Sequence, residues 1–148
     1  MKKTLSGLLI VLGLSAAAQN SFSPVREALR LFNKYKPTIE KDNDAIVDEP
    51  KVISGDINND SLEDCIIFFV MTSKDGGNVI TDQEAAIYIN KGNRMKVVGA
   101  FPKFNFCYAV DRIDKQVIYL KEYKCAPPYN EFIKEHRVIY LNGTIKEK

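Results

Sequence analysis

The run CIIFFVM occupies residues 65–71 and is apolar at every position. A strand with one face in solvent alternates apolar and polar residues, whereas this run has no polar face. We therefore predict a strand from Cys65 to Thr72 that is buried on both faces and central to its sheet.

Further strands are predicted on either side of this run, from their apolar content and from the turn residues that separate them. With the central strand included, they cover residues 51–55, 65–72, 85–90, 95–101, 104–111, 116–123 and 137–141. Short turns at 91–93 and 112–115 join neighbouring strands, and longer loops are expected at 74–81 and 125–131. Strands joined by short turns predict an antiparallel meander.

One helix is predicted before the strands. Ser23 is a suitable N-cap and Pro24 suits the first helical position. Apolar residues then recur at three- and four-residue spacing, and Pro37 is expected to end the helix. Residues 38–50 are interpreted as a connecting segment. The predicted fold class is α+β, with this N-terminal amphipathic helix packed on an antiparallel meander sheet of about six to seven strands.

The first eighteen residues are typical of a cleaved signal peptide. Lys2 and Lys3 precede an apolar core at 5–14, and small residues at 15–18 predict cleavage before Gln19. The core has about ten residues, whereas a membrane span needs about twenty. No cysteine follows it, so a lipoprotein anchor is not expected. We predict a secreted or periplasmic protein, with a single domain over residues 19–148 and no membrane span in the mature chain.

The charge of the chain gives no indication of a nucleic-acid partner. The chain has 21 basic and 19 acidic residues, and residues 1–18 contain two lysines and no acid. The remaining chain therefore has 19 of each. Nucleic-acid binding needs clustered excess lysine and arginine, which this sequence lacks.

Three cysteines are present, which is an odd number for a protein expected in an oxidising compartment. Cys107 and Cys125 flank a predicted hairpin, so we predict a disulfide between them. Cys65 begins the apolar run and is expected to be free and buried. A zinc site is not expected, because His136 is the sole histidine.

The segment GDINNDSLED at residues 55–64 has the spacing of a metal-binding loop. Asp56, Asn58, Asp60 and Asp64 occupy positions 1, 3, 5 and 9, and the main-chain carbonyl of Leu62 occupies position 7. Calcium binds six to eight oxygen ligands, and a loop with oxygen side chains at alternate positions can surround it. These five residues are the predicted calcium ligands.

This loop resembles the calcium loops of FG-GAP and VCBS repeats, and more loosely those of dockerins and EF-hands. The flanking strands favour the FG-GAP type. Ser61 replaces the usual glycine and must adopt a positive φ, at a cost of about 1 kcal/mol. Position 12 is Ile67 rather than the EF-hand glutamate. Only Asp56–Asp64 resembles these repeats, and one copy does not build a propeller. The alternative is a turn whose Asx side chains bond their own backbone.

Aromatic residues are frequent late in the chain, and Phe104, Phe106 and Tyr108 share one face of a predicted strand. This face either packs under the helix or forms an exposed platform for a glycan or peptide, with residues 127–129 at its rim.

No catalytic constellation is evident in the sequence. We therefore expect an exported binding or structural module, stabilised by calcium, whose partner is an unknown protein or glycan. One alternative is a secreted enzyme inhibitor that presents loop 74–81 or loop 125–131. Another is a hydrolase with paired carboxylates such as Glu84 and Glu122. His136 is expected to be a strand-end surface residue.

Overall fold

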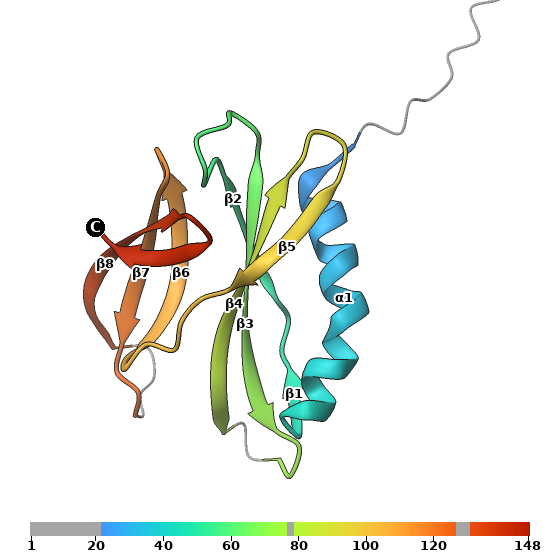
Figure 1. Ribbon diagram of the computed structural model, residues 1–148. Helices are drawn as coiled ribbons and strands as arrows, with labels where there is room; N and C mark the ends of the chain where they lie inside the picture. The colour runs from blue at the N-terminus through green and yellow to red at the C-terminus, as the bar shows by residue number, and fades with distance from the viewer. Residues whose placement is uncertain (1–21, 77–78, 127–130) are drawn as a thin grey trace, which may run out of the picture.

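The computed structural model describes residues 22–76, 79–126 and 131–148, so the predicted signal peptide lies outside the described residues. The described residues form one helix and nine strands (Figure 1). In chain order these are α1 (Pro24–Asp42), β1 (Ala45–Val47), β2 (Lys51–Gly55), β3 (Asp64–Ser73), β4 (Ile80–Asn90), β5 (Met95–Ala100), β6 (Cys107–Asp114), β7 (Val117–Tyr123), β8 (Phe132–Leu141) and β9 (Thr144–Glu147).

The strands form two antiparallel sheets. In the first sheet the order is β1-β3-β4-β5, and β2 pairs with the same edge of β3 as β1 does. In the second sheet the order is β6-β7-β8-β9. The α+β class is confirmed, but the layout differs from the single meander that we predicted. The chain leaves the first sheet after Ala100 and enters the second at Cys107, where the sequence predicted a strand from Phe104.

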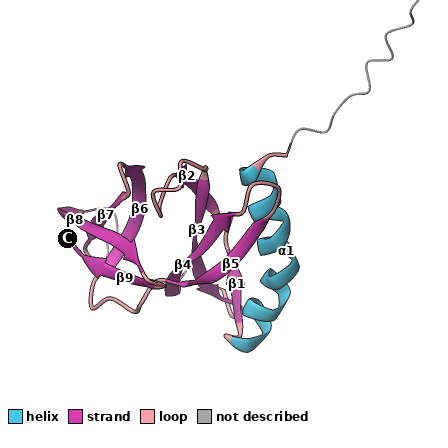
Figure 2. Ribbon diagram, turned by 45° about the horizontal axis from the view of Figure 1, so that its top comes forward, coloured by secondary structure: helices cyan, strands magenta, loops and turns pink. Residues whose placement is uncertain are grey.

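Helix α1 covers one face of the first sheet and the second sheet covers the other (Figures 1 and 2). Strand β3 lies in the middle of these three layers. Its residues Cys65, Ile67, Phe69 and Met71 pack in the cluster beneath α1, whereas Ile66 and Phe68 pack in the cluster between the sheets. The prediction of a central strand buried on both faces is confirmed.

The helix begins as predicted but does not end at Pro37. The side chain of Ser23 accepts a hydrogen bond from Arg26 N, and the Phe32 ring packs 5.0 Å from that of Phe69. The helix runs on through Pro37 to Asp42. A proline inside a helix removes one hydrogen bond. The turn after Pro37 is anchored to the next strand, because Glu40 Oε1 accepts a bond from Val47 N at 3.0 Å.

Other element boundaries also differ from the prediction. Residues 45–47, interpreted as a connecting segment, form β1. Strand β8 begins at Phe132 rather than at Arg137. Strand β9 was not predicted. It follows a turn at Asn142 and Gly143 with φ values of 51° and 85°, and an Asn-Gly pair is a strong hairpin signal.

The two sheets approach closely where β2 faces β6. A Cβ atom added to Gly55 would lie 2.8 Å from Cβ and Cγ2 of Ile113, so only glycine fits there without movement. At the other end of β2, Lys51 Nζ donates a hydrogen bond to the Val110 carbonyl of β6 at 3.3 Å. Ile66, Ile87, Ile118 and Leu120 are among the buried residues between the sheets.

The predicted disulfide is confirmed. Cys107, at the start of β6, is bonded to Cys125, just after β7, with their Cα atoms 5.3 Å apart. Cys65 is free and buried, as predicted. Among the described residues, the structure contains no helix with the length and apolarity that a membrane span requires.

Candidate functional site

The acidic loop between β2 and β3 brings three of its carboxylates together. Asp56, Asp60 and Asp64 each offer an oxygen atom, and these atoms lie within 4.8 Å of one another. Two ligands that both bind calcium at 2.3–2.6 Å can be at most about 5 Å apart. The spacing of the three carboxylates therefore fits a metal ion.

Asp64 is the anchor of this loop. Its side chain is fully buried, and its two oxygens accept hydrogen bonds from Ile57 N at 3.0 Å and Asn90 N at 2.8 Å. Burial raises the pKa of Asp64, and the neighbouring carboxylates raise it further, while the two backbone N–H groups lower it. One side chain thus joins the loop, the start of β3 and the end of β4.

The other members of the loop bond mainly to its own backbone. Asp56 accepts bonds from Asn59 N at 2.7 Å and from Ser61 N at 2.9 Å. Asp60 accepts a bond from Leu62 N and another from the side-chain amide of Asn58, both at 2.9 Å. The φ of Ser61 is 64°, the positive value predicted for it.

The five predicted ligands therefore differ in their placement. Asn58 is joined to Asp60 by hydrogen bonds. Leu62 bonds to Asp60 through its N–H, not through its carbonyl. The role of the Leu62 carbonyl as a ligand therefore stays a prediction. A carboxylate has about four lone-pair sites, which leaves capacity for a cation beside the N–H bonds. The same bonds also suit the Asx-rich turn that was the alternative prediction.

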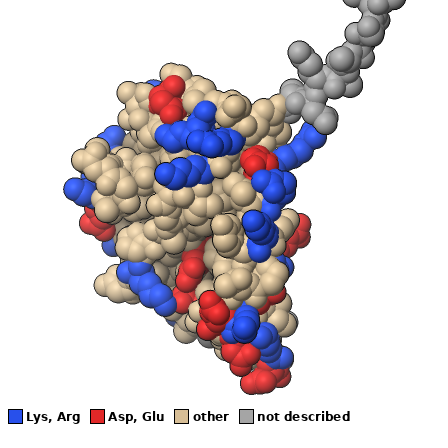
Figure 3. All heavy atoms as spheres, turned by 45° about the vertical axis from the view of Figure 1, so that its right-hand side comes forward, with Lys and Arg blue, Asp and Glu red and all other residues tan. Residues whose placement is uncertain are grey.

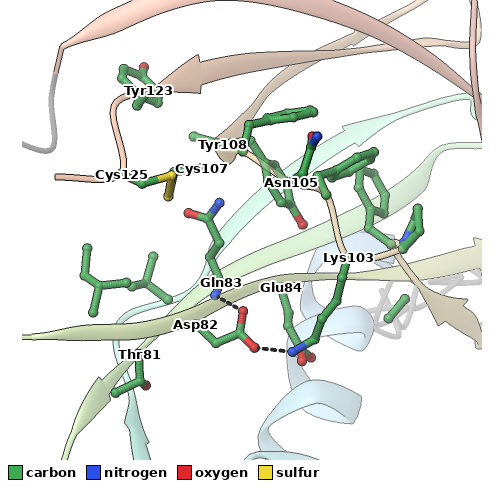
Figure 4. A pocket seen from close by; sticks show the side chains of 18 of the residues that line it. Thr81, Asp82, Gln83, Glu84, Lys103, Asn105, Cys107, Tyr108, Tyr123 and Cys125 are labelled. Atoms are coloured by element: carbon green, nitrogen blue, oxygen red, sulfur yellow. Dashed lines mark hydrogen bonds and ion pairs between the residues drawn. A yellow bond between two sulfur atoms is a disulfide. The ribbon is translucent and has the colours of Figure 1, made fainter.

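A second candidate site, which we call the inter-sheet cleft, opens between the two sheets. Its volume is 730 Å³. Its walls are the start of β4 (80–84), the connection from the first sheet to the second (100–106), the disulfide-linked ends of β6 and β7 (107–109 and 123–125) and Val70. Figure 4 shows Asp82, Glu84 and Lys103 at one end of it, with Tyr108 and the disulfide opposite.

Aromatic rings line the inter-sheet cleft. Phe104 lies at the centre of the group, with its ring 4.9 Å from Phe106, 5.2 Å from Tyr108 and 6.3 Å from Phe101. These rings belong to the core between the sheets, so the expectation that they pack under the helix is wrong. The helix covers the opposite face of the first sheet. Phe104 and Phe106 are only partly buried, and each lines the cleft.

The charged groups of the cleft are two acids and two bases. Lys103 Nζ lies 2.7 Å from Asp82 Oδ2. Burial and the nearby Asp82 raise the pKa of Glu84, whereas Lys103 lowers it. Lys124 is bound to Glu131 at 3.1 Å. Glu84 is thus the carboxylate of the cleft for which the structure records no ion pair among the described residues.

Gln83 connects the two sheets at the edge of the cleft. With its amide oriented so that both polar atoms have partners, its carboxamide donates from Nε2 to the Tyr108 carbonyl at 3.1 Å and accepts from Tyr108 N. Its own N–H donates to Asp82 Oδ1 at 2.8 Å. Exposed strand edges are templates for pairing with another chain. The N–H of Gln83 in β4 and the N–H and carbonyl of Tyr108 in β6 are therefore already bonded to side chains of the protein itself, and are not free to pair with another chain.

The remaining candidates from the sequence do not form a shared site. His136 Nε2 lies 2.6 Å from Glu122 Oε2, and its ring stacks on Phe106 at 4.1 Å. His136 is partly buried in this contact rather than simply at the surface. Glu84, which was considered together with Glu122 as the carboxylate pair of a hydrolase, interacts with Asp82 and Lys103. The two loops considered for an inhibitor lie partly outside the described residues.

The inter-sheet cleft was not predicted from the sequence. Its walls come from elements that are distant in the chain, and the local sequence patterns contain no signal that these elements meet. On the face shown in Figure 3, basic and acidic side chains are interspersed, and acidic ones are seen towards its lower half. Comparison of the chain with protein-family models, curated proteins and solved structures found no match.

Proposed function

We propose that this protein is an exported binding module that takes a small ligand in the inter-sheet cleft and is stabilised by calcium at the β2–β3 loop. The observation on which the proposal rests is the cleft itself. Its 730 Å³ lie within the range of about 300–1,000 Å³ that is typical of ligand pockets. Its lining also has the usual composition, with mostly apolar walls and a few polar groups.

The walls of the cleft are cross-linked, which favours a preformed site. The Cys107–Cys125 disulfide holds one end and the Gln83 carboxamide bridges the sheets beside it. A preformed pocket loses less conformational entropy when its ligand binds. The disulfide is also compatible with an extracellular location.

The calcium part of the proposal is supported by the spacing and chemistry of the loop. Asp56, Asp60 and Asp64 would supply carboxylate oxygens, with Asn58 and the Leu62 carbonyl as further ligands. Extracellular calcium sites can be weak, with dissociation constants of about 10⁻⁴–10⁻³ M. The ion would have a structural role, because Asp64 is bonded to Asn90 at the end of β4, whereas the cleft lies at the start of that strand.

A nuclear magnetic resonance titration with a fragment library tests the cleft. We expect the amides that shift to be those of the lining residues, in the presence and absence of calcium alike. Ala100→Trp, which places an indole in the cleft, should abolish the shifts. Val97→Trp, at an exposed position of the same strand outside the cleft, should retain them. Fragments whose shifts fall elsewhere, or that bind equally well to Ala100→Trp, would exclude the cleft as the binding site.

A further inference from the structure

The balance of charge in the inter-sheet cleft indicates which ligand it suits. The ammonium group of Lys103 is already bound to Asp82, and that of Lys124 to Glu131, which is not part of the lining. An incoming anion would therefore find both cations engaged. It would also meet Glu84, which is half-buried.

We infer, on the basis of the function proposed for the cleft, that its ligand is an organic cation whose ammonium or guanidinium group pairs with Glu84 and whose apolar body lies against the aromatic wall. Three kinds of contact in the cleft suit such a molecule. The carboxylate of Glu84 can accept charge-assisted hydrogen bonds from it. The partly exposed ring of Phe104 attracts cations and can also cover an apolar chain.

The state of Glu84 supports this choice. Burial is the main cause of its raised pKa, and Asp82 adds to it, so ionisation of Glu84 is less favourable in the free protein than that of an exposed carboxyl group. A bound cation would favour the ionised form. An anionic ligand would instead oppose it. An extended peptide that adds as a strand is disfavoured, because side chains already occupy the edge groups of Gln83 and Tyr108.

Three probes with the same apolar body and different charge test the inference. They are 4-phenylbutylamine, 4-phenylbutan-1-ol and 4-phenylbutanoate, titrated into the purified protein by calorimetry, with the site located from amide shifts. We expect the amine to bind about tenfold more tightly than the alcohol or more, and the carboxylate to bind most weakly. Glu84→Gln should remove the advantage of the amine and leave the alcohol unchanged. Glu135→Gln, on β8 outside the cleft, is the matched control and should change neither.

A second variant predicts a gain of binding, which a folding defect cannot produce. Lys103→Gln releases Asp82 and removes a like charge, so the amine should bind about two- to fivefold more tightly. A capped phenylalanyl-lysine dipeptide and its norleucine counterpart distinguish the two sources of the cation. Tighter binding of the lysine dipeptide than of the free amine indicates a side chain of a peptide, and the reverse indicates a small amine.

The outcomes separate the ligand class from the cleft. If the alcohol or the carboxylate binds in the cleft as tightly as the amine, the inference that the ligand is a cation is wrong, but the proposed binding function stands. If the amine keeps its advantage in Glu84→Gln, the role of Glu84 is wrong. If no probe shifts the lining amides and the fragment library also fails, the proposed function falls together with this inference.

Discussion

Replacement of Asp64 by asparagine tests the most buried polar contact of the acidic loop. Asp64 is 0% exposed, and each of its oxygens accepts a bond from a backbone N–H, Ile57 on one side and Asn90 on the other. In Asp64→Asn one oxygen becomes an NH₂ group that faces a donor. One charge-assisted bond is lost and one buried N–H is left without a partner.

The expected loss is about 3 kcal/mol in the free energy of unfolding. Hydrogen bonds to charged groups contribute about 1.5–3 kcal/mol, and an unsatisfied buried group costs about 1–3 kcal/mol. Removal of a buried charge offsets part of this sum. With a urea slope of about 1–3 kcal/mol/M, the unfolding midpoint should fall by about 1–3 M.

The assay is urea unfolding in the presence of a chelator, so that loss of a bound metal cannot account for the change. Asp60→Asn is the matched control, because Asp60 is exposed and accepts its bonds near the surface of the loop. It should cost less than about 1 kcal/mol. If Asp64→Asn in chelator has the stability of the wild type to within about 0.5 kcal/mol, the anchoring role of Asp64 is refuted.

Further predictions concern the sheets, the ion, the thiols and pH. Gly55→Ala should lower the stability by about 1–3 kcal/mol, because its Cβ would meet Ile113; an unchanged urea midpoint would contradict the packing of the two sheets. Millimolar calcium should raise the melting temperature and Asp60→Ala should remove this increase, whereas equal melting in calcium and chelator would eliminate the metal site. Thiol counting on denatured, unreduced protein should give one thiol, that of Cys65, and three would rule out the disulfide. Burial raises the pKa of Glu84 from 4.5, so its contribution to stability is present at low pH and is lost as the pH rises through the folded pKa. Glu84→Gln should therefore reduce the fall in stability as the pH rises from 4.5 through the folded pKa of Glu84. An unchanged dependence of stability on pH would count against the raised pKa.

The parts of the fold that could be predicted are those with a strong local signal. The apolar run of β3 and the N-cap at Ser23 are of this kind. Pro37 was misinterpreted because its cost to the helix is local, whereas the bond from Val47 N to Glu40 that holds the following turn spans two elements. The division into two sheets was missed for a similar reason. Residues 104–106 have the apolar alternation of a strand, yet they leave the first sheet and line the cleft.

The candidate sites differ in the same way. The acidic loop is recognisable from spacing alone, because its side chains lie within nine residues of one another. The burial of Asp64 within this loop could not be predicted, since it depends on Asn90 in another strand. The inter-sheet cleft arises from elements distant in the chain, and only the structure places Glu84 near Lys103 and the aromatic residues.

A crystal structure of the protein with 4-phenylbutylamine is the most direct test of the binding function. We predict density for the ligand in the inter-sheet cleft, with its ring against Phe104 and its ammonium group within hydrogen-bonding distance of Glu84. Density at another site under saturating ligand, with the cleft containing solvent alone, would contradict it.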